Sequence, residues 1–257
     1  MKINKVKAVP EEGVVFKQQG NVLIIQLNRP EKKNALTTSM YLAITSVLQE
    51  ARGDDNIRSV LITGQSDCFC AGNDIEDFLN QDEDDASAPM KMLLQLVSFD
   101  KPLIAAVGGN AVGIGVTLLL HCDLVYVAED AKMCMPFVNL AVVPEAGSTL
   151  LLPNIMGHHR ASELLMLGEV FDGRKARDYG IANDSLPADQ VFDHAFKKAR
   201  RIAAQPAESV RLTKQLLRKS EQDDVEHRMG EEGMIFAKRL KSDECRMLMK
   251  AFMNTRG

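Results

Sequence analysis

Tryptophan is absent from this 257-residue chain, which contains only 3 tyrosines and 5 cysteines. The cysteines are irregularly spaced, and Cys68 and Cys70 form their one close pair. This pattern matches neither a zinc site nor a disulfide framework, so we expect reduced thiols and no bound metal. His121, His158 and His159 also lack a ligand spacing with any cysteine or carboxylate.

The chain also lacks an excess of basic charge and a long apolar run. Its formal net charge of −4 at pH 7 argues against nucleic acid or an anionic membrane as the main partner. No apolar run approaches the ~20 residues that span a bilayer. The N-terminus MKINKVKAVPEEG has no secretory core, and the C-terminus NTRG is no peroxisomal or ER address. We therefore expect a cytoplasmic protein.

Strand and helix patterns alternate through the first part of the chain. Thr37 or Thr38 suits the cap of a helix that ends at Gly53, and residues 90–97 predict a second helix. After residue 149 only helices are expected, punctuated by glycine and proline. Short apolar runs predict strands over 22–28, 59–63, 103–107 and 123–128. The later helices are expected over 149–156, 159–167, 174–179, 187–204, 206–218, 221–239 and 243–253.

The acidic stretch 80–88 (NQDEDDASA) is poor in apolar residues. Such a composition is typical of a solvated flexible loop, with a mobile lid as the alternative. The methionines of the C-terminal helices indicate core or subunit packing rather than a ligand site.

Two loops of small residues follow expected strands and precede helices. One is 69–74 (FCAGND), and the other is Gly113-Ile114-Gly115. Side by side they could offer two backbone N–H groups to one oxygen, an oxyanion hole. Alternatively, each lets a helix pack closely on a sheet. Neither is a dinucleotide or P-loop fingerprint.

Glu145 stands alone in an apolar stretch, between Pro144 and Ala146 and next to a helix start. Burial without a partner would raise its pKa and suit it to act as a base. The alternative is that its carboxylate caps the first-turn N–H groups of that helix. Residues alone leave both interpretations open.

Other polar residues receive structural interpretations. Asp74 is expected to cap the helix at 75–79, and Asp123 to begin a strand. Ser148 lacks the frame of a serine hydrolase. Arg29, Lys32 and Lys33 share one turn that could hold a phosphate or simply face solvent.

These segments, in this order, resemble the crotonase family, also called the enoyl-CoA hydratase/isomerase superfamily. The resemblance covers nearly the whole chain. It is carried by LNRPEKKNAL at 27–36, ITGQSDCFCAGNDIEDF at 62–78, residues 101–133, residues 165–183, and the stretch from Phe236 through SDECRMLMKAF at 242–252.

The resemblance implies an α/β fold, a spiral of β-β-α turns over 1–200 with a helical trimerisation region over 201–257. It implies an acyl-CoA thioester as substrate, with no other cofactor, and a homotrimer or dimer of trimers. Asn73 and Ile114 would supply the oxyanion N–H groups through the backbone, so their side chains would be free to vary. The expected CoA contacts are Arg29, Lys33, Cys70, Ala71, Gly72 and Gly113; the expected pocket residues are Thr117, Phe137 and Asp74.

The departures from the family pattern narrow the reaction. Where enoyl-CoA hydratases have two glutamates, this chain has Thr117 and Phe137, and neither can be a base. Glu145 stands in PEAGST where hydratases have a glycine, and this resembles the peroxisomal-type Δ3,Δ2-enoyl-CoA isomerases. The leading hypothesis is that isomerase, with Glu145 as its one catalytic carboxylate. The alternatives are another crotonase chemistry, of hydratase or dienoyl-CoA isomerase type, and a non-catalytic acyl-CoA-binding module.

Overall fold

The computed structural model describes residues 12–65, 67–79, 88–219 and 222–254. The acidic stretch expected to form a loop or lid falls outside these ranges, apart from Ala88. Within them, no helix combines the length and the apolar character needed to cross a bilayer.

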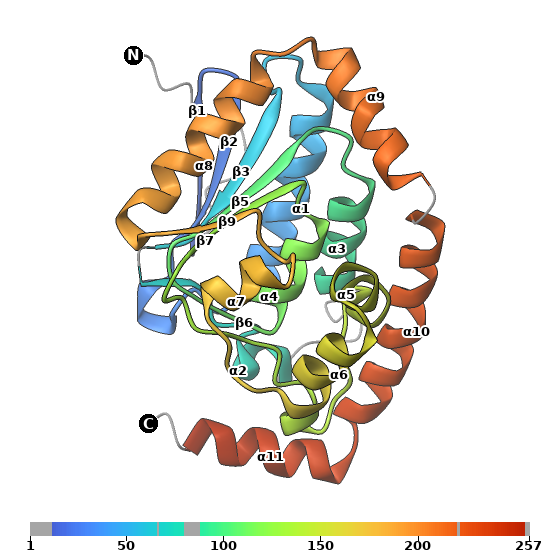
Figure 1. Cartoon of the computed structure of the whole chain (residues 1–257). Helices are drawn as coiled ribbons and strands as arrows, with labels where there is room; N and C mark the ends of the chain where they lie inside the picture. The colour runs from blue at the N-terminus through green and yellow to red at the C-terminus, as the bar shows by residue number, and fades with distance from the viewer. Residues whose placement is uncertain (1–11, 66, 80–87, 220–221, 255–257) are drawn as a thin grey trace.

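A six-stranded sheet forms the centre of the molecule (Figure 1). Only the first pair is antiparallel; every later pair is parallel, and the central strands are buried along their whole length. Continuous apolar runs such as LIAAV suit strands covered on both faces. In spatial order the strands are β1 (Val14–Gln19), β2 (Val22–Leu27), β3 (Ser59–Thr63), β5 (Leu103–Val107), β7 (Leu124–Ala128) and β9 (Asp184–Leu186).

A second, small sheet pairs the segments that follow the central strands. It consists of β4 (Cys68–Cys70), β6 (Asn110–Val112) and β8 (Met133–Cys134), all parallel. Three successive turns of the chain, which begin at β3, β5 and β7, therefore run from the large sheet to the small one and then into helices. This is the expected spiral of β-β-α turns. The expectation of a plain loop over 69–74 was wrong at its start, because Phe69 and Cys70 belong to β4.

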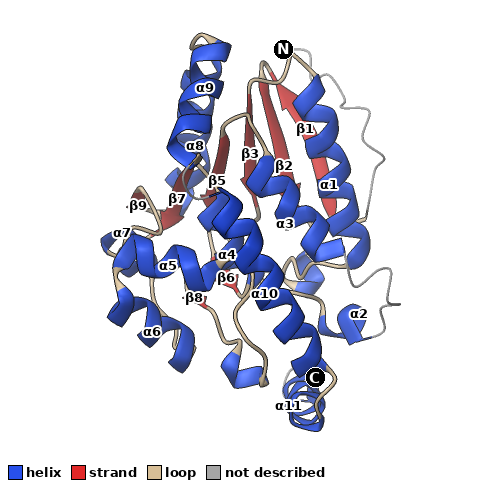
Figure 2. Ribbon diagram, turned by 90° about the vertical axis from the view of Figure 1, so that its right-hand side faces the viewer, coloured by secondary structure: helices blue, strands red, loops and turns tan. Residues whose placement is uncertain are grey.

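Helices cover both faces of the large sheet (Figure 2). α8 (Ala188–Ala203) packs against β3, β5 and β7, while α1 (Thr38–Gly53) and α3 (Ala88–Ser98) pack together on the other side. Thr37 caps α1 by accepting from the N–H of Met40, which confirms one of the two predicted caps.

Short helices follow the small sheet, and long ones end the chain. The helical series expected after residue 149 is interrupted by β9, so the expectation of helices alone was wrong there. The other helices are α2 (Ile75–Leu79), α4 (Ile114–Thr117), α5 (Ser148–Met156), α6 (His158–Leu167), α7 (Gly173–Asp178), α9 (Ala207–Arg218), α10 (Gln222–Leu240) and α11 (Asp243–Asn254), with 3-10 turns at Pro30–Lys32, Leu118–His121 and Val138–Leu140.

The C-terminal helices fold back onto the rest of the chain. α10 contacts α3 and α5, and α11 contacts the turn Val138–Leu140. Figure 2 shows α10 running across the front of the molecule from the level of α3 toward α11. The division at residue 200 stays a prediction, but α10 reaches the middle of the molecule.

A buried ion pair fastens α9 to the start of the central strands. The Lys214 ammonium donates to the Asp123 carboxylate and to the carbonyl of Lys101, both at 2.7 Å. The same carboxylate accepts from the N–H of Leu103 at 2.7 Å. Asp123, directly before β7, thus has the structural role that its position predicts.

Replacing Lys214 by Met should lower the free energy of unfolding by about 3 kcal/mol, because the Asp123 carboxylate loses its most buried partner. Urea denaturation would measure the loss. Lys219→Met, at an exposed position just after α9, is the matched control and should leave stability unchanged. Equal urea midpoints for the two variants would contradict this role for Lys214.

Candidate active site

Glu145 lies in a tight turn just ahead of α5. The next two residues, Ala146 and Gly147, have φ angles of +64° and +69°, so the chain turns sharply before the helix begins at Ser148. A left-handed alanine is uncommon and indicates a backbone held by its surroundings. The turn places the Glu145 carboxylate against Thr117, the last residue of α4, whose hydroxyl donates to Oε1 at 2.5 Å.

The protonation of Glu145 is shifted toward neutral pH. Burial raises its pKa to about 7, the nearby charge of Glu232 adds to the increase, and the hydrogen bond from Thr117 opposes it. The side chain is only partly buried, so it keeps a face that a substrate can approach. A carboxylate near neutrality can both take and return a proton at physiological pH.

Glu145 does not cap α5, so the alternative reading of this residue was wrong. The capping carboxylate belongs to Glu232 of α10, which accepts from the N–H groups of Gly147 and Thr149. The Glu145 carboxylate is therefore not used in capping the helix and remains available for acid–base chemistry.

In the loop after β4, the backbone N–H of Asn73 forms no hydrogen bond with any other described residue. Asn73 forms a parallel bridge with Leu36, in which Leu36 donates to the Gly72 carbonyl and Asp74 donates to the Leu36 carbonyl. These bonds do not involve the N–H of Asn73, which points away from the bridge. The backbone N–H of Ile114 also lacks an acceptor within its own helix, because Ile114 is the first residue of α4 and no earlier turn supplies one.

The two loops lie against each other. A Cβ added at Gly115 would stand 2.6 Å from the Cys70 carbonyl oxygen, and one at Gly72 would stand 3.3 Å from the Val112 carbonyl oxygen. Only glycine permits both approaches. The structure thus brings together the stretches that carry Asn73 and Ile114.

Tyr41 links the first loop to α1. The hydroxyl of the buried Tyr41 donates to Asn73 Oδ1 and holds the Asn73 side chain in place. Burial chiefly raises the pKa of this hydroxyl, and the nearby Cys70 and Glu145 groups add to it. Glu145 also adds to the raised pKa of Cys70, about 12. The carboxylate thus lies within electrostatic reach of both groups beside the first loop.

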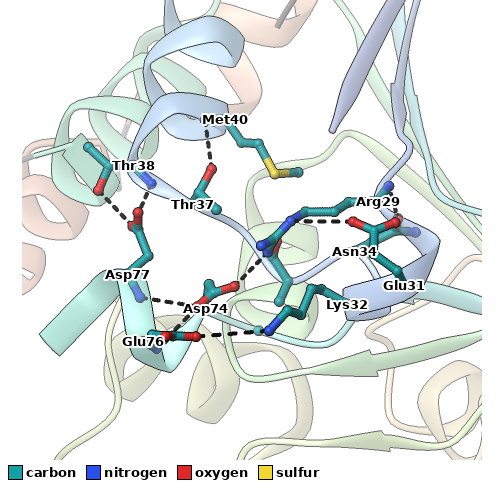
Figure 3. A network of polar contacts seen from close by, with 12 residues as sticks. Arg29, Glu31, Lys32, Asn34, Thr37, Thr38, Met40, Asp74, Glu76 and Asp77 are labelled. Carbon is teal, nitrogen blue, oxygen red and sulfur yellow. Dashed lines mark hydrogen bonds and ion pairs between the residues drawn. The ribbon is translucent and has the colours of Figure 1, made fainter. Parts of the chain in front are cut away.

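Arg29 and Asp74 form the centre of a polar network at the rim of this loop (Figure 3). Arg29 donates to Asp74 at 2.6 Å and to the Ala35 carbonyl at 3.2 Å. The other Asp74 oxygen accepts from the N–H groups of Glu76 and Asp77, which confirms its predicted capping of α2. Burial opposes the Asp74 charge, but these donors lower its pKa below the ordinary value.

This network bears on two predicted ligand contacts. The Arg29 guanidinium is already committed to Asp74, whereas the Lys33 side chain is exposed. Lys32 pairs with Glu76 across 4.0 Å (Figure 3). Lys33 is therefore the better placed of the predicted phosphate contacts.

The other residues predicted to contact the substrate or CoA lie between Cys70 and Phe137 in the chain. Cys70 and Thr117 are fully buried, and Gly113 caps α4 with φ of +54°. The Ala71 N–H donates to the Lys33 carbonyl at 3.0 Å. Phe137 is buried directly before the turn Val138–Leu140. Ser148 Oγ is buried and has no hydrogen-bond partner among the described residues, which agrees with the exclusion of a serine hydrolase.

With this geometry established, the chain can be compared with known proteins. Residues 17–257 match the family model described as enoyl-CoA hydratase/isomerase. The chain belongs to the enoyl-CoA hydratase/isomerase family. Rat enoyl-CoA delta isomerase 2 is 34% identical over 254 residues, which are 96% of this chain but 65% of that protein. The chain thus spans slightly less than two thirds of that relative.

Other relatives in the family carry other names. The 2,3-dehydroadipyl-CoA hydratase of Escherichia coli is 30% identical over 248 residues, covering 95% of this chain and 96% of that protein. The solved structure of Pseudomonas aeruginosa OdaA is 44% identical and superposes with a TM-score of 0.92 over 95% of this chain and 99% of that one. These matches confirm the crotonase fold predicted from the resemblance.

Three residues that contact the site were missed by sequence reasoning. Tyr41 holds Asn73, His121 contacts the carbonyl of Ala146, and Glu232 caps α5. A signal for Glu232 existed, since Val225, Met229 and Glu232 recur at helical spacing and are the buried residues of α10. A carboxylate on an otherwise apolar stripe indicates a specific partner.

Proposed function

We propose that this member of the enoyl-CoA hydratase/isomerase family is a Δ3,Δ2-enoyl-CoA isomerase with Glu145 as its acid and base. The observation that carries the proposal is the Glu145 carboxylate itself: partly buried, with a pKa raised to about 7 and held by Thr117 near the two loops. A proton shuttle beside a thioester carbonyl requires a group of this kind.

The reaction begins when the thioester oxygen accepts hydrogen bonds from the backbone N–H groups of Asn73 and Ile114. Polarising that carbonyl acidifies the C2 protons, and the ionised Glu145 removes one of them. The electrons of the broken C–H bond form a C1=C2 bond and move the carbonyl π electrons onto the thioester oxygen, which gives a dienolate. When the carbonyl re-forms, the C1=C2 electrons form the C2=C3 bond and the C3=C4 electrons take up a proton at C4. Glu145 returns this proton to C4, which completes a 2-enoyl-CoA with no gain or loss of atoms.

Thr117 and Phe137 favour isomerisation over hydration. They replace the two glutamates that hydratases use to activate water, and both are buried. The Thr117 hydroxyl donates its hydrogen bond to Glu145, and a hydroxyl cannot act as a base at neutral pH. A site without a second carboxylate at these positions protects a dienolate from water.

Hydration is the second candidate, because the Escherichia coli relative is named a hydratase and the match covers nearly its whole length. The two are separated by offering the protein a 3-enoyl-CoA and, separately, a 2-enoyl-CoA. We expect the absorbance of the conjugated thioester to rise with the first and to persist with the second. Hydration would be favoured if the absorbance fell with the 2-enoyl-CoA and did not rise with the 3-enoyl-CoA. A protein that binds CoA but changes the absorbance of neither substrate would be a binding module.

The pH dependence should report Glu145 directly. Because the base must be ionised, kcat/KM should fall about ten-fold per pH unit below the pKa of about 7 and level off above it. Thr117→Val removes the hydrogen bond that opposes protonation, so its acid limb should move to higher pH. A limb at the ordinary pKa of an exposed glutamate, unmoved in Thr117→Val, would contradict this assignment.

We further infer a homotrimer or dimer of trimers, as the family resemblance implies. Large apolar side chains stand out from the C-terminal helices, among them Leu216 at 72%, Leu217 at 77% and Met234 at 71% exposure. Exposed apolar residues of this number fit surfaces that pack against other subunits. Sedimentation velocity would give the assembly mass.

A further inference from the structure

Helix α10 places a buried carboxylate on the turn that carries Glu145. Glu232 is 4% exposed, and its two oxygens accept three hydrogen bonds. Gly147 N–H lies 2.6 Å from Oε2, while the N–H and the hydroxyl of Thr149 lie 3.0 Å and 2.6 Å from Oε1. Three donors aimed at one carboxyl group fit its ionised form.

Side-chain packing also restricts the contact between α10 and the turn at Gly147. Val225 and Met229 face the same turn: a Cβ added at Gly147 would stand 3.2 Å from Val225 Cγ1 and 3.5 Å from Met229 Cγ. Val225, Met229 and Glu232 are the buried residues of α10, so one stripe of that helix covers Gly147. The left-handed φ of Gly147 also makes the position specific for glycine.

The turn is held from its other side as well. Buried His121 donates from Nε2 to the Ala146 carbonyl at 2.9 Å. Burial and, to a smaller extent, the nearby charge of Arg218 lower the pKa of His121 to about 4, so the ring is neutral at physiological pH. Ala146 and Gly147 are therefore each fixed by one polar side chain, directly after Glu145.

Charged and titratable groups surround Glu145 on several elements. Tyr41 of α1 and Cys70 of β4 lie within electrostatic reach, with pKa values raised chiefly by burial, so both stay neutral at physiological pH. Glu232 of α10 adds negative charge, and its influence raises the pKa of Glu145. Arg228, also on α10, donates to the Thr149 hydroxyl at 3.2 Å and partly offsets the charge of Glu232.

We propose that Glu232 is a positioning residue for catalysis: by capping α5 it fixes the turn that aims Glu145, and its charge tunes proton transfer at Glu145. The inference rests on the proposed role of Glu145 as the base. Glu232 itself touches neither substrate nor reacting atoms in this scheme. It acts through the backbone of Gly147 and Thr149, so that helix α10 contributes to catalysis.

Glu232→Gln tests the proposal, because the amide keeps the size of the side chain but removes its charge and turns a donor toward a backbone N–H. We expect kcat to fall about ten-fold with KM nearly unchanged, since a displaced base slows proton transfer and not binding. The acid limb of kcat/KM should move to lower pH. Asp224→Asn removes an exposed charge from the first turn of α10 and should change neither property.

Two further measurements separate positioning from simple loss of stability. Amide hydrogen exchange over 146–151 should be faster in Glu232→Gln, with the central strands equally protected. Thr149→Val, which removes one donor to Glu232 but leaves every carboxylate in place, should show the faster exchange with a smaller shift of the acid limb. An unmoved acid limb and unchanged exchange in Glu232→Gln would overturn the proposal.

Infrared titration of the Glu145 carboxyl, assigned by its loss in Glu145→Gln, gives a readout without substrate. A lower titration midpoint in Glu232→Gln supports the inference even if the protein catalyses a reaction other than isomerisation. An identical midpoint with intact isomerase activity in the wild type would overturn the inference and leave the proposed function standing.

Discussion

Glu145→Gln should lose about three orders of magnitude in kcat for conversion of a 3-enoyl-CoA to its 2-enoyl isomer. The amide preserves the volume of the side chain and can still accept the hydrogen bond from Thr117. It cannot take up a proton, and general acid–base catalysis by one group contributes about 10²–10⁴-fold. The change should leave affinity for the CoA thioester nearly unchanged, because in the proposed reaction Glu145 acts at the reacting carbons and not at the nucleotide.

The comparison is sharpest when steady-state rates and acyl-CoA binding are measured on the same preparations. Glu76→Gln, an exposed carboxylate at the rim of the loop after β4, is the control. It should retain wild-type turnover. A Glu145→Gln protein that turns over as fast as the wild type would rule out Glu145 as the base.

Gly115→Ala should lower both activity and stability. The added Cβ would lie 2.6 Å from the Cys70 carbonyl oxygen and 2.9 Å from the Cys70 Cβ, and neither atom is the end of a flexible side chain. α4 would have to move away from β4 and carry the N–H of Ile114 with it. We expect kcat/KM to fall about 10²-fold and the free energy of unfolding to drop by about 1–3 kcal/mol.

Gly230→Ala is the matched control for this substitution. Gly230 lies inside α10, and a Cβ there meets no atom within 4 Å. Alanine is the better helix former, so this variant should be as active as the wild type and slightly more stable. Thermal melting and the isomerase assay test both variants together. Wild-type activity in Gly115→Ala would show that the spacing of the two loops is not critical.

The sequence predicts the four central strands of the large sheet and most helices because these elements are strongly patterned. The strands 59–63 and 103–107 match the structure at both ends. β4, β6 and β8 were missed, since strands of two or three residues carry no readable periodicity. β1 was missed for a different reason: half of VVFKQQ is polar, without the alternation of a strand, and its pairing with β2 is seen only in the structure.

The candidate site was predictable where it is local and hidden where it depends on distant contacts. Glu145 stands out in the sequence because a carboxylate interrupts an apolar stretch at a helix start. Whether it caps that helix could not be decided locally. The answer depends on Glu232, which lies 85 residues from Gly147 and occupies the cap in its place.

The resemblance to a family adds what chemistry alone leaves open. Backbone donors at Asn73 and Ile114 follow from a bridge and a helix start, but the thioester they would face does not. In the other direction, the structure adds what the resemblance does not contain: Tyr41 holding Asn73, and Arg29 committed to Asp74. Both contacts restrict side chains that the backbone roles alone would leave free.

The most direct test of a single acid and base at Glu145 is label transfer. A 3-enoyl-CoA carrying deuterium at C2 would be converted in a single turnover in ordinary water, and the product analysed by NMR. We expect part of the deuterium to appear at C4, because one carboxylate removes it and returns it. Product whose C4 carries only solvent hydrogen, at every reaction time, would contradict transfer by Glu145 alone.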